Sequence, residues 1–256
     1  MPNLLVIKGN TALKAAWSDG VTIGKTFRYQ GEKMLDYLLS LMEKDKPEVL
    51  TMASVDGVPP EEEAVLSRLC RHLIILDSSH THYLLKYDFP EYLSPDRAAG
   101  LVAARFLFKD KNCTVFDFGT TLNIDFLGSD GRYLGGNISP GCRTRFKALN
   151  RYSKALPLVD TPENVSLEGS SVQSSIESGV ILGIMFEIEG YIKSRQDNIV
   201  IFTGGDAIYF AKKMKNSIFV VCNLELMGLA IITEDYVSKN IKLTIECTQL
   251  QKSIEL

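Results

Sequence analysis

Apolar positions along the chain form short continuous runs and longer periodic stretches, and the two kinds alternate. Continuous runs at 49–55 and 72–76 predict buried strands, because a strand covered on both faces needs no polar alternation. Apolar residues at helical spacing predict helices at 32–44, 96–108, 143–156 and 172–192. Strands that alternate with helices are typical of an α/β protein, and this is the fold class that we expect.

Two segments far apart in the chain share one plan. The segments LLVIKGNTALKAAW (4–17) and CTVFDFGTTLNIDFL (113–127) each have an apolar run, a tight turn with glycine and small polar residues, and a second run. Each is predicted to form a β-hairpin. The same hairpin at the start of each half predicts two similar α/β domains. We place their boundary in the polar KDKN segment, which gives domains of residues 1–112 and 113–256.

Hairpin turns of this composition suit a nucleoside triphosphate. Glycine lets backbone N–H groups approach phosphate oxygens, and asparagine or threonine side chains donate further hydrogen bonds. One such turn is an ordinary hairpin feature, but a pair predicts that two domains clamp the phosphates in the cleft between them. The segment NIVIFTGG (198–205) predicts a parallel strand that ends in two glycines.

The charge balance and the lack of long apolar stretches argue against two kinds of partner. The formal net charge is −3, the pI is about 5.7 and the basic residues are scattered, so we expect no binding to nucleic acid. No run approaches the roughly 18 apolar residues of a membrane span, and the N-terminus lacks a signal-peptide pattern. The five cysteines form no CxxC pair, which indicates reduced core thiols. We therefore expect a cytoplasmic protein without a membrane partner.

A series of ordered motifs gives the chain a specific resemblance. The motifs are YDFPEYLSPDR (87–97), DFGTT (117–121), GRYLGGNISPG (131–141), RFKALNRYSKALPLV (145–159), GSSVQSSIESGVILG (169–183) and IFTGGDA (201–207). In order and spacing, from the first hairpin to about Leu229, they resemble the type III pantothenate kinase family. The resemblance implies two similar actin-like (ribonuclease H-like) domains with a nucleotide cleft between them. It also implies a homodimer that phosphorylates pantothenate with ATP to 4′-phosphopantothenate, the first step of coenzyme A biosynthesis.

The same resemblance implies roles for individual residues. Asp96 resembles the general base that takes the proton of the pantothenate hydroxyl, although an acid at a helix start is also favoured by the helix dipole alone. Asp117 resembles the ligand of a monovalent cation, potassium or ammonium, while magnesium bridges the phosphates. The other implied contacts are Tyr87, Arg97 and the positions of Ser94 and Val172 for the substrate, and Asn10, Thr11, Lys14, Thr120, Gly204 and Gly205 for the nucleotide. Without the resemblance, Tyr87 fits simple core packing, and the two glycines fit an ordinary turn.

Three positions depart from the family pattern. The aspartate that helps to hold magnesium in the first hairpin of the family is Ile7 here, followed by Lys8. An isoleucine cannot ligate or orient a hydrated cation, which needs oxygen ligands. A threonine that contacts pantothenate in the family is Val172, and the loss of one hydrogen bond weakens binding by about tenfold. A glycine of the family is Ser94, a change that the segment tolerates.

These departures leave two further functions open. A paralogue that binds nucleotide or a pantothenate-like ligand as a regulator would tolerate both Ile7 and Val172. A related kinase or phosphatase with another small substrate is suggested by Val172 alone. In an active pantothenate kinase, Asp125 and Asp206 are candidates for a carboxylate that replaces the missing one.

Overall fold

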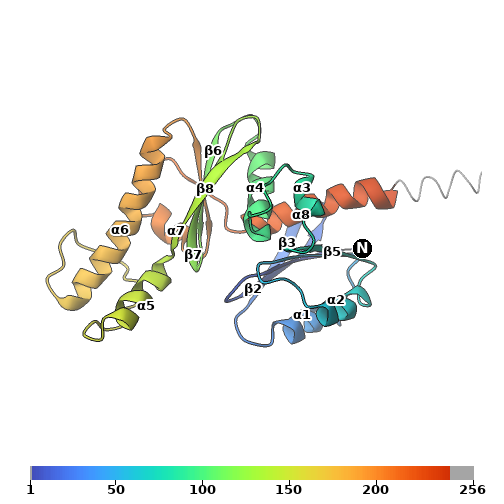
Figure 1. Cartoon of the computed structure of the whole chain (residues 1–256), viewed down its shortest axis with the longest axis horizontal. Helices are drawn as coiled ribbons and strands as arrows, with labels where there is room; N and C mark the ends of the chain where they lie inside the picture. The colour runs from blue at the N-terminus through green and yellow to red at the C-terminus, as the bar shows by residue number, and fades with distance from the viewer. Residues whose placement is uncertain (1, 243–256) are drawn as a thin grey trace, which may run out of the picture. The chain divides into compact units, whose positions relative to one another are not determined.

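The chain forms two compact units in a computed structural model that describes residues 2–242. Unit 1 contains the residues up to Ala103 and those from Leu224 onward, and unit 2 contains Ala104–Asn223. Each unit has its own β-sheet (Figure 1). This division differs from the single boundary that the sequence suggested near residue 112, because the chain returns to unit 1 at Leu224.

The sheet of unit 1 carries the first hairpin. Its strands are β1 (Asn3–Lys8), β2 (Leu13–Asp19), β3 (Thr22–Tyr29), β4 (Val49–Ser54) and β5 (His72–Leu76), in the order β3-β2-β1-β4-β5. The first three strands are antiparallel neighbours, whereas β4 is parallel to both β1 and β5. The hairpin predicted from the sequence is therefore confirmed as β1 and β2, and its first strand is central in the sheet.

Helices cover both faces of this sheet. They are α1 (Met34–Met42), α2 (Pro60–Ser67), α3 (His82–Leu85), α4 (Pro95–Leu107, whose last residues belong to unit 2), α8 (Leu224–Tyr236) and the π-helix η1 (Val237–Lys242). α1 and α2 lie on one face, where Leu38 and Leu66 join Leu4 and Val6 in one core (Figure 1). α8 packs against β1, β2, β3 and β4.

α8 explains why the chain returns to unit 1. Most of its side chains are buried, including Leu224, Leu226, Leu229 and Ile232. A helix that is apolar on nearly all sides must be covered by other elements. On the sheet it also forms a buried hydrogen bond of 2.6 Å between the hydroxyl groups of Thr233 and Thr51.

The sheet of unit 2 repeats the plan of unit 1. Its strands are β6 (Cys113–Phe118), β7 (Thr121–Leu127), β8 (Tyr133–Pro140), β9 (Ile199–Gly204) and β10 (Phe219–Val220), in the order β10-β9-β6-β7-β8. β6, β7 and β8 are antiparallel neighbours, and β9 is parallel to β6 and β10. The repeat predicted from the two hairpins and the α/β fold class are both confirmed.

The helices of unit 2 are α5 (Cys142–Tyr152), α6 (Val172–Ser194) and α7 (Ala207–Ala211). They enclose an aromatic core in which Phe116, Phe118 and Phe202 of the sheet meet Phe146 and Phe210 of the helices. Ring pairs at centroid distances of 4.8 Å and 5.1 Å join Phe118 to Phe202 and to Phe210. The second hairpin is therefore supported by a tightly packed aromatic core.

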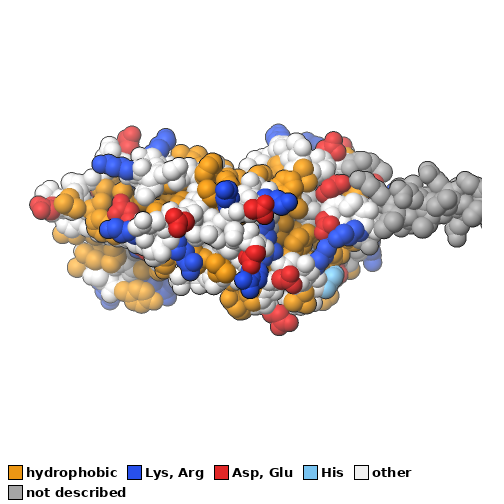
Figure 2. Space-filling model, turned by 90° about the horizontal axis from the view of Figure 1, so that it is seen from above, with side chains coloured by type: hydrophobic (Ala, Val, Ile, Leu, Met, Phe, Trp, Pro, Cys, Tyr) orange, Lys and Arg blue, Asp and Glu red, His pale blue; other side chains and the backbone are white. Residues whose placement is uncertain are grey.

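The surface carries both signs of charge, and acidic and basic side chains are interspersed on the face shown in Figure 2. Within residues 2–242, no helix has the length and apolar character to cross a membrane. Cys113 and Cys142 are buried free thiols, as expected, but the free thiol of Cys222 is exposed. Cys247 lies outside the described residues.

Candidate active site

The turn of the first hairpin presents its predicted nucleotide contacts to solvent. The Gly9 N–H donates to the Ala12 carbonyl at 3.0 Å, which closes the turn. Asn10 and Thr11 are exposed between these two residues. A closed turn with exposed small polar side chains is compatible with the predicted phosphate contacts.

The two lysines next to this turn lie on opposite faces of the sheet. Lys8 pairs with Leu13, and Ile7 pairs with Lys14 in the strand register. Because paired residues share a face and successive residues alternate, Lys14 lies on the same face as Ile7 and Lys8 on the other. The Lys8 ammonium contacts Glu62 at 3.1 Å, and the Lys14 ammonium contacts Glu225 of α8 at 3.0 Å.

Glu225 is a buried acid on the face of Ile7. Its residue is 4% exposed, and its Oε1 accepts from the Lys14 ammonium, whereas the buried Oε2 has no hydrogen-bond partner. A methyl group placed on Gly100 of α4 would lie 3.9 Å from the Glu225 Cγ, so the side chain also lies beside that helix. Glu225 therefore stands between the first hairpin and α4.

α4 carries the predicted base. Asp96 is half-buried in the first turn, and its Oδ1 accepts the Arg97 backbone N–H at 2.9 Å. Arg97 is buried at 9% exposure, and Ser94 precedes the helix, where its carbonyl accepts the Ala98 N–H at 3.0 Å. Residues four apart share a helix face, so Asp96 lies one turn from Gly100 on the same face of α4. The predicted base and Glu225 thus belong to one neighbourhood of unit 1.

Tyr87 lies before α4 and is tied to α8. Its hydroxyl donates to Asp235 Oδ2 at 3.1 Å, and the same carboxylate contacts the Lys86 ammonium. Burial, and then the Asp235 charge, raise the pKa of Tyr87 well above its usual value. The hydroxyl therefore stays protonated at neutral pH and acts as a hydrogen-bond donor.

The second hairpin turn is braced by the start of α5. The Thr120 carbonyl accepts from the Gly141 N–H at 3.0 Å and from the Thr144 hydroxyl at 2.6 Å. Thr120 itself is exposed. The two donors hold the turn in place while its outer side stays accessible. Gly141 and Thr144 were not assigned this role from the sequence, because the contact joins elements that are separated along the chain.

Asp117 and Gly204 lie together in unit 2. Asp117 pairs with Asn123 on β7 and Thr203 on β9, so these three residues share one face of the sheet. Gly204 has φ of +90°, and a Cβ at this position would lie 2.5 Å from Asp117 Oδ1 and from the Phe118 carbonyl. Gly204 is therefore required by its close approach to β6, and the Gly205 N–H donates to the Phe118 carbonyl at 2.8 Å.

The remaining predicted positions also lie in unit 2. Val172 is the first residue of α6 and is 57% exposed, next to a capping box formed by Ser171 and Ser174. Asp125 is buried on β7, where its Oδ1 accepts the Tyr133 hydroxyl at 2.9 Å. Asp206 precedes α7. In contrast to these two acids, Glu225 belongs to the same unit as Ile7.

Two oxygen atoms without a hydrogen-bond partner are of the chemical kind that binds the cations implied by the resemblance. On the face of Ile7, Glu225 offers a carboxylate oxygen without a hydrogen-bond partner, and hydrated magnesium is held by such hard oxygen donors. In unit 2, the buried hydroxyl of Thr203 also has no hydrogen-bond partner and lies beside Asp117 in the register. Within the described residues, no group of three or more His, Cys, Asp and Glu side chains is arranged to hold a metal ion.

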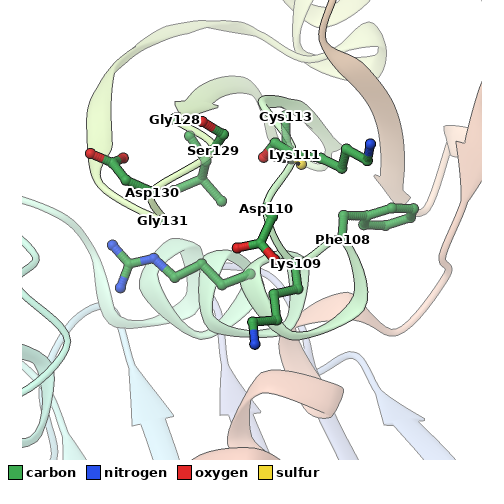
Figure 3. A pocket seen from close by; sticks show the side chains of 11 residues that line it. Phe108, Lys109, Asp110, Lys111, Cys113, Gly128, Ser129, Asp130 and Gly131 are labelled. Atoms are coloured by element: carbon green, nitrogen blue, oxygen red, sulfur yellow. Dashed lines mark hydrogen bonds between the residues drawn. The ribbon is translucent and has the colours of Figure 1, made fainter.

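Two pockets lie within single units. One, of about 450 Å³ in unit 1, is lined by Asn10 at the hairpin turn together with Lys8, Glu62 and the start of α1. The other, of about 250 Å³ in unit 2, lies where the segment of Phe108 and Lys111 faces the loop of Gly128 and Gly131 (Figure 3). It is lined by Cys113 and Leu127, at the end of the second hairpin remote from its turn, and by none of the predicted site residues.

Two α/β units with one strand order, each with a hairpin of its first two strands, are typical of the actin-like fold of acetate and sugar kinases. Solved proteins share this fold. A Baf-family protein from Campylobacter jejuni matches with a TM-score of 0.62 and 21% identity over 92% of this chain and 99% of that chain. The activator of 2-hydroxyisocaproyl-CoA dehydratase from Clostridium difficile matches with a TM-score of 0.57 and 14% identity, over 94% and 97% of the two chains. The ROK hexokinase from Thermus thermophilus matches with a TM-score of 0.50 and 12% identity, over 91% of this chain and 98% of that chain.

Sequence comparison is more specific. The family model described as type III pantothenate kinase matches residues 3–194. A type III pantothenate kinase from Phocaeicola vulgatus is 37% identical over 232 residues, which are 89% of this chain and 96% of the relative. One from Flavobacterium psychrophilum is 35% identical over 233 residues, 88% and 96% of the two chains. The chain belongs to the type III pantothenate kinase family.

Proposed function

We propose that the protein transfers the γ-phosphoryl group of ATP to the hydroxyl group of pantothenate, which gives 4′-phosphopantothenate and ADP. Membership of the family, matched over residues 3–194, supports this proposal most directly. The fold agrees, because both units carry a hairpin with an exposed small polar turn. The protein is thus an enzyme of the first step of coenzyme A biosynthesis.

In this proposal Asp96 is the general base. It accepts the proton of the pantothenate hydroxyl as the oxygen attacks the γ-phosphorus and the bond to the ADP oxygen breaks. The hydrogen bond from the Arg97 N–H at 2.9 Å orients the carboxylate. Arg97 and the Tyr87 hydroxyl bind polar groups of pantothenate, and Ser94 and Val172 contact the same substrate.

The hairpins bind phosphate oxygens in this proposal. Asn10, Thr11 and Lys14 donate from unit 1, and Thr120 donates from unit 2. The Gly204 and Gly205 backbone lies against the nucleotide. Magnesium that accompanies ATP would neutralise phosphate charge, and Glu225 is a carboxylate that contacts Lys14 of the first hairpin on the face of Ile7.

A coupled ADP-release assay of the purified full chain tests the function. With ATP, magnesium and potassium, ADP release is expected to require pantothenate, and mass spectrometry is expected to find one phosphoryl group added to pantothenate. ADP release that depends on another acceptor would replace the substrate in this proposal. ATP binding without any turnover would instead favour the regulator.

We also propose a cytoplasmic homodimer with a potassium or ammonium ion at Asp117. ATP and reduced thiols are typical of the cytoplasm, and the other two features are those of the family. Activity is expected to rise with potassium or ammonium but not with sodium, and Asp117→Ala is expected to abolish the difference. Equal rates of the parent protein in sodium and potassium would argue against a cation site at Asp117.

A further inference from the structure

The first hairpin lacks the acid at position 7, yet its Lys14 has a carboxylate partner. Ile7 and Lys14 are directly paired across β1 and β2, so an acid at position 7 would lie beside the Lys14 ammonium. In this chain the carboxylate at the ammonium comes from Glu225 of α8, at 3.0 Å. The charge has the same sign and lies at the lysine that is paired with position 7, but it comes from another element.

The burial of the pair favours a defined geometry. The Glu225 side chain is 5% exposed and the Lys14 side chain is 28% exposed, so the acid is fixed inside while the lysine reaches the surface. A buried charge that loses its partner is strongly destabilising, whereas exposed ion pairs contribute little to stability. Glu225 therefore restricts where the Lys14 ammonium can lie. Because Glu225 Oε2 has no hydrogen-bond partner, the contact with Lys14 compensates the negative charge of Glu225.

The position of Glu225 also links the hairpin to the helix of the base. The Glu225 side chain lies beside Gly100, one turn along α4 from Asp96 on the same helix face. Asn10 and Thr11, the predicted phosphate contacts, lie in the turn that Lys14 follows.

We propose that Glu225 is a positioning residue that replaces the missing hairpin aspartate and holds the Lys14 ammonium in place for the phosphate groups of ATP. This inference rests on the proposed function. It also specifies which acid compensates for Ile7, in place of Asp125 or Asp206.

The first experiment measures the accessibility of Lys14 without any activity. Brief acylation of the full chain with an amine-reactive ester, followed by peptide mass spectrometry, gives the labelling rate of each lysine. Glu225→Gln is expected to raise the Lys14 rate by about fivefold or more, because the amine is no longer held against a charged carboxylate and reaches the reagent more freely. Ile7→Asp added to Glu225→Gln is expected to restore protection, and Ile7→Asn, which has the same shape without the charge, is not.

The chain supplies a matched control on the other face of the same hairpin. Lys8 is paired with Glu62 at 3.1 Å, and its side chain is 21% exposed, close to the value for Lys14. Glu62→Gln is expected to raise labelling of Lys8 and leave Lys14 unchanged. Glu225→Gln is expected to do the reverse.

The second experiment separates positioning from binding and from stability. Glu225→Gln is expected to lower kcat by about 10- to 100-fold, because a displaced phosphate contact costs rate steeply. The Kd for ATP is expected to change little. The Lys14 ammonium is held less firmly in this variant, but the removal of the negative charge of Glu225 favours the binding of the phosphates and offsets that loss. Ile7→Asp should restore kcat in the Glu225→Gln protein, and Glu62→Gln should keep the parent kcat. Thermal unfolding of each variant identifies losses caused by misfolding, and Glu225→Asp serves if Glu225→Gln does not fold.

The outcomes distinguish the two proposals. Unchanged Lys14 labelling, or a parent kcat in a folded Glu225→Gln protein, would overturn the role of Glu225. A loss of kcat that Ile7→Asp does not restore would also overturn it, because it would show that the carboxylate cannot be supplied from position 7. If labelling follows the expected pattern but the parent protein does not phosphorylate pantothenate, the proposed function fails while the placement of Lys14 by Glu225 stands.

Discussion

At the scale of single residues, the roles that follow from one short segment differ from those that depend on distant contacts. Asp96, at the start of α4, could be identified as the candidate base from the motif in residues 87–97, and the helix start was predicted within a residue. Glu225 could not be identified, because nothing in its own segment indicates that it contacts Lys14, 211 positions earlier. A contact of that separation exists only after the sheet and α8 have packed together.

Replacement of Asp96 tests the base. Asp96→Asn keeps the shape of the side chain but cannot accept the hydroxyl proton, so kcat is expected to fall by about 100-fold or more. The Kd for ATP is expected to stay near that of the parent protein. Steady-state kinetics and calorimetric titration with ATP measure the two quantities. Near-normal turnover in the folded variant would remove Asp96 from the mechanism.

The ionised carboxylate of Asp77 contributes to the stability of the folded protein. The residue is 2% exposed, and its carboxylate accepts from the backbone N–H groups of Ser79, His80 and Val58 at 2.8, 2.9 and 3.2 Å. Burial by itself raises the pKa of Asp77, but these bonds and the one with the His80 ring at 2.9 Å outweigh it and lower the pKa. Because the folded-state pKa lies below the unfolded value, the contribution to stability is complete above the unfolded pKa and is lost as the pH falls through the folded one.

Asp77→Asn is therefore expected to lower the free energy of unfolding at pH 7 by about 1–3 kcal/mol, because its NH₂ group replaces one accepting oxygen and leaves either the Val58 N–H or the Ser79 and His80 N–H groups without that acceptor. The loss should shrink as the pH falls below about 4, where the parent protein also loses its charge. Denaturant unfolding at several pH values measures this. Asp56→Asn, at an exposed position nearby, is the control and should change little. If the difference in the free energy of unfolding between the two proteins stayed constant down to pH 2, the charge of Asp77 would not be its cause.

At the scale of elements, the hairpins, the buried strands and the longer helices could be predicted because each produces its pattern within its own residues. The strand pairs β1–β2 and β6–β7 agree with the predicted hairpins, and β9 is parallel to β6 as expected. β3 and β8 were missed because each has an exposed, weakly apolar pattern, which reflects an edge position. α8 was missed as a part of unit 1, because an apolar helix does not specify which sheet will cover it.

The packing of α8 on α4 can be tested at one glycine. A Cβ at Gly228 would lie 1.7 Å from the Ala99 carbonyl oxygen, a backbone atom that cannot move without moving the helix. Gly228→Ala is therefore expected to destabilise the protein by about 2 kcal/mol or more through overpacking. Gly190 of α6 is the matched control, because nothing lies within 4 Å of a Cβ there. Gly190→Ala is expected to stabilise by about 0.5–1 kcal/mol through helix propensity. Equal effects of the two changes on thermal unfolding would argue against the close crossing of α4 and α8.

At the scale of the whole molecule, the order of the strands explains the repeat and the path of the chain explains the unit boundaries. Both sheets place three antiparallel strands before two parallel ones, and this regularity made the two-domain fold predictable from two hairpins. The boundaries depend instead on where the last helix packs. Unit 2 is continuous in sequence, whereas unit 1 needs two separate segments of the chain.

Two shortened proteins test this division. Residues 1–112 alone contain the first sheet but not α8, so Leu5 and Thr51, both fully buried in the complete chain, would lose the cover that α8 provides. Residues 1–107 joined by a flexible Gly/Ser linker to residues 224–256 restore that cover and keep α4 whole.

The joined protein is expected to unfold cooperatively on heating, because the apolar face of its sheet is again removed from water. The 1–112 protein is expected to lack a cooperative transition and to bind a hydrophobic dye, as a chain without specific packing does. Circular dichroism melts and dye fluorescence measure both. A cooperative transition at the same temperature in the two proteins would show that unit 1 ends near residue 112 and that α8 adds nothing to its core.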